Sequence, residues 1–370
     1  MVIEAIRRLV ESLDLKIDEA DPGKPFFSDP RYETYPITVD RFHRIERKDS
    51  HRRLVFIDGG NQEVLGTANY SIQANRVYFN VFDGHDRLSA NRLPPRIDFF
   101  SATNSVIRSG EIFFETAVFP AEERFKEFLP SEKDLAFDSF DRTLREGLER
   151  VDVAKAASMA RRFAELQYAY RIILDEMERG DILVLDGSLQ TSFTNEADYA
   201  KRVFEAAKSK GVIVTGLSKT SRLFTTTGLA LLGAAQKVAH QSGLDVWYIL
   251  LAESKSTDHN AAIFGVKLNA VTDYVFRFEV YYDQYESMGP GELMEVLWRL
   301  TENSSDISFP GYPYGLVDAD RFARVRFDEA ESYYLILLSE LIKAGKKDKF
   351  VRYIRTIDAH SILDKLADER

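Results

Sequence analysis

The chain has 370 residues, of which 45% are hydrophobic and 29% charged, and it carries a formal net charge of -10. This length allows a substantial core in one large domain or two, and the negative total argues against a surface that binds nucleic acid over its whole area. Cysteine is absent. The sequence therefore excludes disulfides, zinc–thiolate sites, iron–sulfur clusters and thiol catalysis.

The N-terminal segment predicts an amphipathic helix followed by an extended connector. Apolar residues recur among acidic and basic ones over residues 1–20, and Glu4 and Glu11 argue against a signal peptide. Residues 18–36 carry four prolines, which is typical of an extended connector. The longest small and apolar stretch, residues 227–235, is far shorter than the roughly 20 residues that span a bilayer. We therefore expect a cytoplasmic protein without a membrane contact.

Strand patterns dominate the next part of the chain and then give way to helical periodicity. Runs rich in β-branched and aromatic residues occupy residues 52–58, 69–83 and 110–120. A helical segment is predicted over about 122–180. Within it, six apolar residues have the spacing of a core-facing helix: Phe163, Leu166, Tyr170, Ile173, Leu174 and Met177.

The second half of the chain alternates strands and helices. Strands are predicted at residues 181–187, 211–219, 246–254 and 274–283, and helices at 196–211 and 291–303. A loop over residues 309–320 then precedes a helical C-terminus. This order predicts the α/β class, with a mixed sheet whose early strands are antiparallel, whose later strands belong to βα units, and whose faces are capped by helices.

Two of the predicted strands end in Asp-Gly, at Asp58 and at Asp186. Asp-Gly is a common turn dipeptide, so each site has an ordinary structural explanation. Ligand sites, however, gather at the carboxyl ends of strands in open α/β sheets. The two aspartates are then either ligands of hard divalent ions or parts of the phosphate hairpins of an actin-like ATPase or sugar kinase. Walker A and Rossmann glycine patterns are absent.

A metal-dependent nuclease needs further carboxylates, and Glu165 is the first candidate. It lies on the predicted helix just before the Asp186 strand, in a strip of apolar residues. Such a carboxylate either points inward toward the strand ends or pairs in solvent with Arg161 or Arg162, and the spacing favours neither. His259, in a Thr-Asp-His-Asn stretch, superficially suggests a His-Asn nuclease element, but the remainder of that motif is missing.

Several segments together resemble the NurA family of nucleases. They appear in the family's order over roughly residues 53–364: FIDGGNQ (56–62), the helix with Glu165, LVLDGSLQ (183–190), GLSKTSRL (216–223), VFRFEV (275–280), GYPYGLVDAD (311–320) and DAHSIL (358–363). The resemblance implies a ribonuclease H-like mixed sheet flanked by helices, a homodimer, and Mn²⁺- or Mg²⁺-dependent cleavage of DNA. It also implies action with a HerA-type hexameric ATPase, in DNA end resection and repair or in antiviral defence.

The resemblance assigns the site residue by residue. Asp58 matches the family's first metal-binding aspartate, Asp186 the aspartate of its second Asp-Gly motif, and Glu165 its helix-borne glutamate. In the last motif the family pattern is approximately Gly-Tyr-Pro-Tyr-Pro-Leu, two variable residues, Ala-His. Here Tyr312 matches the tyrosine, whereas Asp320 stands where the family has its catalytic histidine.

Two further positions depart from the family pattern. Gly315 replaces a proline of the last motif, and Gly60 occurs where serine is common in the first. A carboxylate and an imidazole both ligate divalent ions, so Asp320 is expected to change the metal preference of the site or to weaken it. If the family histidine acts as an acid or base, Asp320 cannot replace it at neutral pH.

The hypothesis that follows is hydrolysis with two ions in each active site. Asp58 bridges the ions, Asp186 and Glu165 hold one each, and Asp320 completes the second. Tyr312 positions the phosphate or supports a ligand, and Lys219 contacts a phosphate. A non-catalytic adaptor that keeps the fold, and an actin-like ATPase, stay as alternatives.

The expected domain limits follow from the same patterns. An N-terminal helix and connector occupy residues 1–50, and the nuclease domain occupies residues 51–330. The helical segment of about 122–180 is an insertion in that domain. Residues 331–370 form a C-terminal helical extension.

Overall fold

The computed structural model describes residues 2–17 and 21–348 and has the predicted α/β fold class, with strands of a large mixed sheet flanked by helices. The chain forms two compact units that are interleaved along the sequence. Among the described residues, the first unit combines 2–17, 21–52, 184–190 and 213–314, and the second combines 53–183, 191–212 and 315–348. In chain order, four antiparallel strands of ten or more residues precede a helix, a strand, a second helix and a strand.

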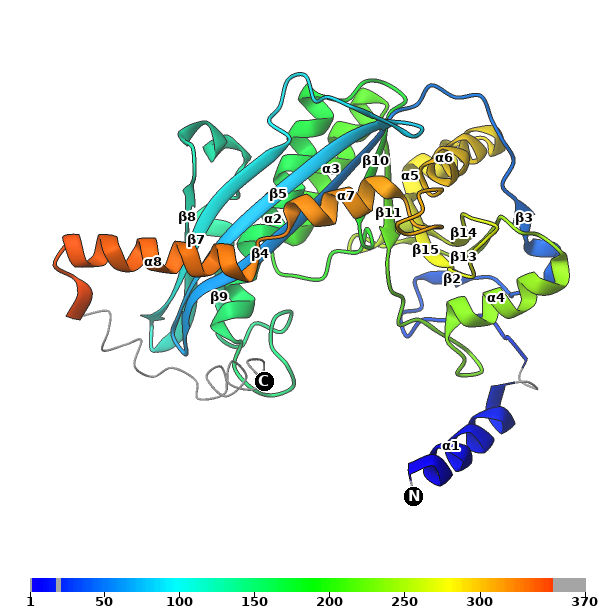
Figure 1. Ribbon diagram of the computed structural model, residues 1–370, viewed down its shortest axis with the longest axis horizontal. Coiled ribbons are helices and arrows are strands. Elements are labelled where there is room, and N and C mark those ends of the chain that lie inside the picture. Colours follow the sequence, from blue (N-terminus) through cyan, green and yellow to red (C-terminus); the bar gives the residue numbers. More distant parts are fainter. Residues whose placement is uncertain (1, 18–20, 349–370) are drawn as a thin grey trace. The chain divides into compact units, whose positions relative to one another are not determined.

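Long antiparallel strands form the sheet of the second unit (Figure 1). Its neighbours, in spatial order, are β4 (Leu54–Thr67), β5 (Tyr70–Asp83), β7 (Arg96–Arg108), β8 (Glu111–Pro120) and β9 (Ala136–Asp138). The short β6 (Asp86–Leu88) pairs with β5. The strand patterns predicted over residues 52–58, 69–83 and 110–120 correspond to β4, β5 and β8.

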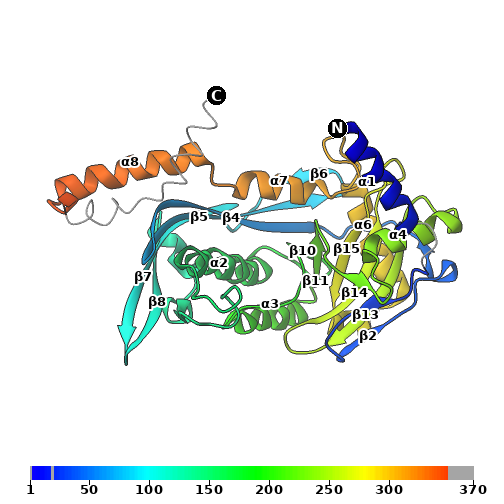
Figure 2. The same cartoon turned by 90° about the horizontal axis from the view of Figure 1, so that it is seen from below.

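Helices cover both faces of this sheet (Figure 2). On one face lie α2 (Val153–Asp175) and α3 (Glu196–Lys210), and on the other lie α7 (Tyr314–Ala323) and α8 (Phe327–Lys343). Four of the six residues predicted to face the core are buried, namely Phe163, Leu166, Ile173 and Met177, whereas Tyr170 and Leu174 are only partly buried. Asp152 caps α2 by accepting a hydrogen bond from the backbone N–H of Ala154 (2.8 Å).

The helical segment predicted over about 122–180 is helical only in its second part. Residues before α2 form 3₁₀ turns at Glu123–Phe128 and Glu132–Leu135, then β9 and a loop. Asp138 and Asp141 accept hydrogen bonds from backbone N–H groups two residues later, at 2.6 Å and 2.8 Å. Such Asx turns compete with helical hydrogen bonding, and they explain why the charged, apparently helical composition does not form a helix here.

The predicted end of the first strand is also wrong. Asp58 does not close β4 but lies inside it, opposite Tyr78 of β5, and β4 continues to Thr67. The strand continues through two glycines because β5 pairs with it along its whole length.

The first unit contains a second run of antiparallel strands. Its spatial order is β2 (Tyr32–Thr34), β13 (Trp247–Lys255), β14 (Asn260–Lys267), β15 (Phe276–Tyr281) and β11 (Ile213–Ser218). The short β3 (His43–Arg44) also pairs with β13, and β1 (Pro25–Phe26) pairs with β12 (Phe224–Thr225). The proline-rich connector is therefore extended, as predicted, and is part of the sheet.

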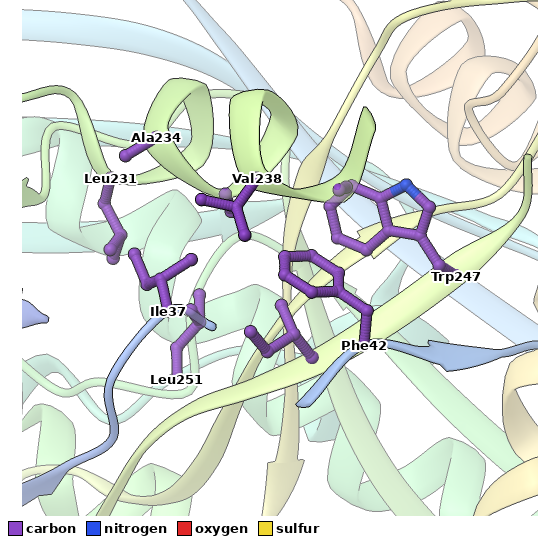
Figure 3. Close-up of a cluster of buried hydrophobic side chains, with 10 residues drawn as sticks. Ile37, Phe42, Leu231, Ala234, Val238, Trp247 and Leu251 are labelled. Carbon is purple, nitrogen blue, oxygen red and sulfur yellow. The ribbon is translucent and has the colours of Figure 1, made fainter. Parts of the chain in front are cut away.

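An apolar cluster joins this sheet to the helix α4 (Leu231–Ser242) (Figure 3). The ring of Trp247 meets Phe42 edge-on, with ring centroids 4.9 Å apart, and Val238 of α4 packs beside them. Because Phe42 follows the proline-rich connector, the cluster ties the N-terminal part of the chain to the later strands. The helices α5 (Tyr282–Ser287) and α6 (Pro290–Asn303) complete the unit.

The terminal helices are present where they were predicted. The amphipathic N-terminal helix is α1 (Val2–Ile17), and α8 occupies the first part of the expected C-terminal extension. The DAHSIL segment lies outside the described residues, as does the rest of the chain from residue 349. Of the helices that the structure describes, none combines the length and the apolar character that crossing a membrane requires.

The short strand β10 (Ile182–Asp186) connects to its neighbours by backbone hydrogen bonds at both ends. The N–H of Ile182 donates to the carbonyl of Arg53 (2.9 Å), just before β4. At the other end, the N–H of Gly187 donates to the carbonyl of Leu217 in β11 (2.9 Å). Asp186 therefore closes its strand, as predicted.

Candidate active site

Asp58 lies on the face of the second unit's sheet that α7 covers. Side chains alternate between the faces of a strand, so positions 58 and 60 point to one face of the sheet and position 59 points to the opposite face. A Cβ on Gly60 would lie 2.3 Å from the carbonyl oxygen of Ala323, the last residue of α7. Asp58 is only 9% exposed, and its Oδ1 accepts a hydrogen bond from the N–H of Gly59 (2.7 Å).

Asp320 is brought to Asp58 by α7. The side-chain amide of Asn80 in β5 donates to the carbonyl of Gly315 and to Asp318, at 2.9 Å each, and so ties α7 to the sheet. One carboxylate oxygen of Asp320 lies within 4.8 Å of one of Asp58. Asp320 also pairs with Arg324 (3.1 Å), one helical turn later. Two carboxylates from distant parts of the chain thus lie together.

The two glycines that depart from the family pattern allow this close packing. The Cβ of any residue at position 60 would meet the backbone of Ala323, which cannot rotate away. A Cβ on Gly315 would lie 2.0 Å from the ring of Phe56 in β4. Both glycines therefore permit α7 to approach β4 more closely than larger residues would.

Glu165 approaches β4 from the opposite face. It lies on α2 and is 2% exposed, and its Oε2 is 3.1 Å from the place that a Cβ of Gly59 would occupy. The guanidinium of Arg161 binds the same oxygen at 2.8 Å, and Arg162 lies 3.9 Å from the other. Glu165 is therefore buried against the strand, as the first alternative holds; it is paired with the arginines of the second alternative, but not in solvent. Among the described residues, the acidic group that contains Asp58 does not include Glu165.

The remaining three candidates meet in the first unit. Lys219, just after β11, forms an ion pair with Asp186 (2.7 Å between Nζ and Oδ2). The hydroxyl of Tyr312 donates to the other oxygen of Asp186 at 3.4 Å. Tyr312 is 1% exposed, and its ring stacks on Phe309 with centroids 5.2 Å apart. Lys219 was predicted to contact a phosphate, and in the structure it neutralises a carboxylate.

Carboxylate oxygens are the donors that hard divalent cations prefer. Asp58 and Asp320 both offer such oxygens, and they lie close enough together to bind the same ion. No thiolate ligand is available, since the chain has no cysteine. The donor set therefore fits Mg²⁺ or Mn²⁺ and does not fit a thiolate-bound metal.

A groove lies beside this pair of carboxylates in the second unit. Its volume is 640 Å³, and it is lined by Gly60, Asn61 and Gln62 of β4 and by the segment 324–328 between α7 and α8. Arg324 and Arg326 both have largely exposed side chains there, and the ring of Phe327 is 59% exposed. Amide groups, two guanidinium groups and an exposed ring give the groove the donors and the flat surface that nucleotides bind.

The buried acid Glu279 was not among the residues predicted from the sequence. It is fully buried in β15, where it binds His259 (3.0 Å) and the backbone N–H of Leu189 (2.8 Å). The available signal was a glutamate inside the otherwise apolar and aromatic VFRFEV segment. His259 was noted in the sequence, but only as part of an incomplete nuclease motif.

The NurA domain profile matches residues 52–325, about three quarters of the chain. The chain belongs to the NurA family. No curated protein matches it in sequence. Among solved structures it is similar to the NurA nuclease from Sulfolobus solfataricus, with 14% identity and a TM-score of 0.52 over 93% of this chain and 95% of that one.

At this level of identity the match shows that the NurA fold is shared. A weaker match is endonuclease V from Ciona intestinalis, in complex with a DNA that contains inosine. It has 8% identity and a TM-score of 0.34, over 74% of this chain and 84% of that one. The predicted resemblance to NurA is thus confirmed by the family profile and by the fold.

Proposed function

We propose that this chain is a divalent-metal-dependent nuclease that hydrolyses phosphodiester bonds in DNA. The observation that carries the proposal is the pair of carboxylates, Asp58 and Asp320, on a chain of the NurA family. Asp58 is held in position by its strand and by its bond from Gly59, so it binds an ion with little reorganisation.

The proposed ligands of the first ion are Asp58, Asp320 and Asp186. Within the second unit, Asp58 and Asp320 each offer one oxygen to the same acidic group. Asp186 is included as the ligand that the resemblance to the family implies, and Lys219 and Tyr312 hold its carboxylate.

Glu165 is the proposed ligand of a second ion. Its carboxylate lies against Gly59, the residue after Asp58, on the face of β4 opposite the Asp58 side chain. Arg161 holds the same oxygen, so binding of the ion requires that Arg161 releases Glu165. The exchange keeps the Glu165 carboxylate next to a positive charge, because a divalent cation takes the place of the guanidinium group.

The side chains of this protein orient the reactants. The divalent ions supply charge compensation for the phosphate and lower the pKa of the attacking water. Tyr312 fixes the orientation of Asp186 through its hydroxyl. Lys219 binds the Asp186 carboxylate. With an ion held by that carboxylate, the ammonium group of Lys219 would be available to an oxygen of the phosphate.

The groove beside Asp58 and Asp320 is the proposed path of the DNA strand. Arg324 and Arg326 bind phosphates, and Phe327 stacks on a base. We also propose that the chain uses Mn²⁺ or Mg²⁺, forms a homodimer and acts with a HerA-type hexameric ATPase. The proposed process is DNA end resection and repair, or antiviral defence. These parts rest on membership of the NurA family.

Removal of one carboxylate tests the function. Asp58→Asn keeps the shape of the side chain and removes its charge, so we expect cleavage of linear DNA in Mn²⁺ to fall at least about tenfold to a hundredfold, the loss that is typical when even indirect supports of a metal are removed. Chelation of the metal should abolish cleavage by the wild type. The matched control is Asp198→Asn, an exposed residue on α3, which should cleave at the wild-type rate.

Two outcomes would reject the proposal. Cleavage by Asp58→Asn at the wild-type rate would exclude this carboxylate from the chemistry. No cleavage by the wild type in Mn²⁺ or Mg²⁺, with or without a HerA-type ATPase, would favour the adaptor, and binding of ATP by the chain alone would favour the actin-like alternative.

A further inference from the structure

The turn that carries Asp186 is fixed on one side by β11. Gly187, the next residue, has a φ of +113°, which side-chain-bearing residues rarely adopt, and its N–H donates to Leu217. Its carbonyl oxygen would lie 2.6 Å from a Cβ on Gly216. The backbone of the turn therefore lies directly against β11, in space that a glycine leaves open.

On its other side the same turn is held by a carboxylate. Glu279 of β15 is directly opposite Gly216 of β11, so both residues face the same side of the sheet. The Oε2 of Glu279 accepts a hydrogen bond from the N–H of Leu189, three residues after Asp186 (2.8 Å). The turn is thus bonded at Gly187 to one strand and at Leu189 to the next.

A buried network keeps Glu279 charged and in one orientation. His259 binds Oε2 through its Nε2 (3.0 Å), and the hydroxyl of Tyr32 binds the other ring nitrogen at 2.6 Å. Arg277 lies 2.5 Å from Oε1. Burial alone would raise the pKa of Glu279, but the charge of Arg277 and the bond from His259 hold it below its ordinary value of 4.5.

We propose that Glu279 is a positioning residue for Asp186: it fixes the turn 187–189, with His259 and Tyr32 behind it, so that the Asp186 carboxylate is held ready for the metal ion. The inference rests on the proposed function, because it assumes that Asp186 is a ligand. Without Glu279 the backbone N–H of Leu189 would be buried and unpaired, and the turn would move to satisfy it. Asp186 would then spend less time in the ligating position.

Two substitutions at this position separate the role of the acceptor from that of the charge. Glu279→Ala removes the acceptor of the Leu189 N–H, and Glu279→Gln keeps an acceptor and loses the charge. The matched control is Glu176→Gln, because Glu176 is also a buried glutamate, and it accepts the N–H groups of Asn91, Arg92 and Leu93 in a different loop. Tyr32→Phe is a milder variant at the outer end of the network, which keeps the inference testable if Glu279→Ala does not fold.

Two measurements are made on the full chain: amide hydrogen exchange of the segment 187–190, and Mn²⁺ binding by calorimetry. In Glu279→Ala we expect faster exchange of the Leu189 amide and Mn²⁺ binding weaker by about tenfold to a hundredfold, with the rate at saturating Mn²⁺ recovering to near the wild-type value. Glu279→Gln and Tyr32→Phe should shift both quantities in the same direction by less. Glu176→Gln should change neither.

The outcomes distinguish this inference from the proposed function. If Asp186→Asn weakens Mn²⁺ binding and Glu279→Ala does not, the inference is wrong and the function stands. The inference is also wrong if Glu176→Gln weakens the binding as much as Glu279→Ala, or if exchange at Leu189 is unchanged. If neither Asp58→Asn nor Asp186→Asn alters Mn²⁺ binding, the proposed function fails and the inference fails with it.

Discussion

At the scale of single residues, the packing around Gly60 explains why this chain has glycine where serine is common in the family. Family members commonly have serine at this position, and the sequence suggested the loss of a hydroxyl group. The structure shows that the position has no room for one, because a Cβ would lie 2.3 Å from the carbonyl oxygen of Ala323 and 3.1 Å from the Cα of Arg324. These are backbone atoms, so no side-chain rotation relieves the contact.

Gly60→Ser should therefore displace α7 and carry Asp320 away from Asp58. We expect the free energy of unfolding to fall by roughly 1–3 kcal/mol, the usual cost of overpacking, and DNA cleavage to fall with it. Denaturant unfolding and cleavage rates measure the two effects. Gly291→Ala is the control, since nothing lies within 4 Å of a Cβ there and alanine favours the helix α6. Wild-type stability and activity in Gly60→Ser would contradict the packing of α7 against β4.

At the scale of elements, periodicity predicted most strands and the long helices, and it failed where tertiary contacts decide. The apolar alternation of β4 stops at Asp58, yet the strand continues, because β5 supplies hydrogen bonds through both glycines. The glycines look like turn residues in the sequence, although their function is to let α2 and α7 approach the strand closely. Such contacts come from segments far away in the chain, so local patterns do not reveal them.

An ion pair in the first turn of α8 makes the stability of the fold depend on pH. Arg76 of β5 is 4% exposed, and it binds Asp98 and Glu329, the latter in the first turn of α8. Tyr333 donates to the same glutamate at 2.7 Å. Burial would raise the pKa of Glu329, but the bonds from Arg76 and Tyr333 lower it below its ordinary value of 4.5.

Because the folded-state pKa is lowered, this contact stabilises the fold above pH 4.5, and the stabilisation is lost as the pH falls through the folded-state pKa. Glu329→Gln should melt at a lower temperature than the wild type at neutral pH, and the difference should disappear in acid. Melting temperatures measured from neutral pH down to acid test this expectation. The control is Glu331→Gln, at an exposed position on the same helix. A difference that persists in acid would mean that the charge of Glu329 is not the cause.

At the scale of the whole molecule, the sequence predicted the candidate residues but not their contacts. The order of the family motifs identified Asp58, Asp186 and Asp320, whereas no periodicity relates residues so far apart. The arginines that hold Glu165, the lysine that neutralises Asp186 and the network around Glu279 all depend on packing. These partners decide how readily each carboxylate takes up a cation, and only the folded chain specifies them.

The net charge of the molecule leads to the last prediction. With 59 acidic and 49 basic residues, the chain repels DNA on average, so the proposed binding of DNA depends on a few local cations. Arg326, in the groove beside the carboxylate pair, has a side chain that is 73% exposed, and we propose it as one of these cations. Each phosphate contact contributes about one to the slope of log affinity against log salt concentration.

Arg326→Gln should therefore reduce that slope by about one and weaken binding about equally for DNA of different sequences, because phosphate contacts do not distinguish bases. Fluorescence anisotropy with labelled double-stranded DNA, in Ca²⁺ or another divalent ion that does not support cleavage, measures the slope. Lys201→Gln, at an exposed position on α3, is the control and should keep the wild-type slope. An unchanged slope in Arg326→Gln would place the DNA strand on another surface, while a change that depends on the DNA sequence would mean that Arg326 contacts bases.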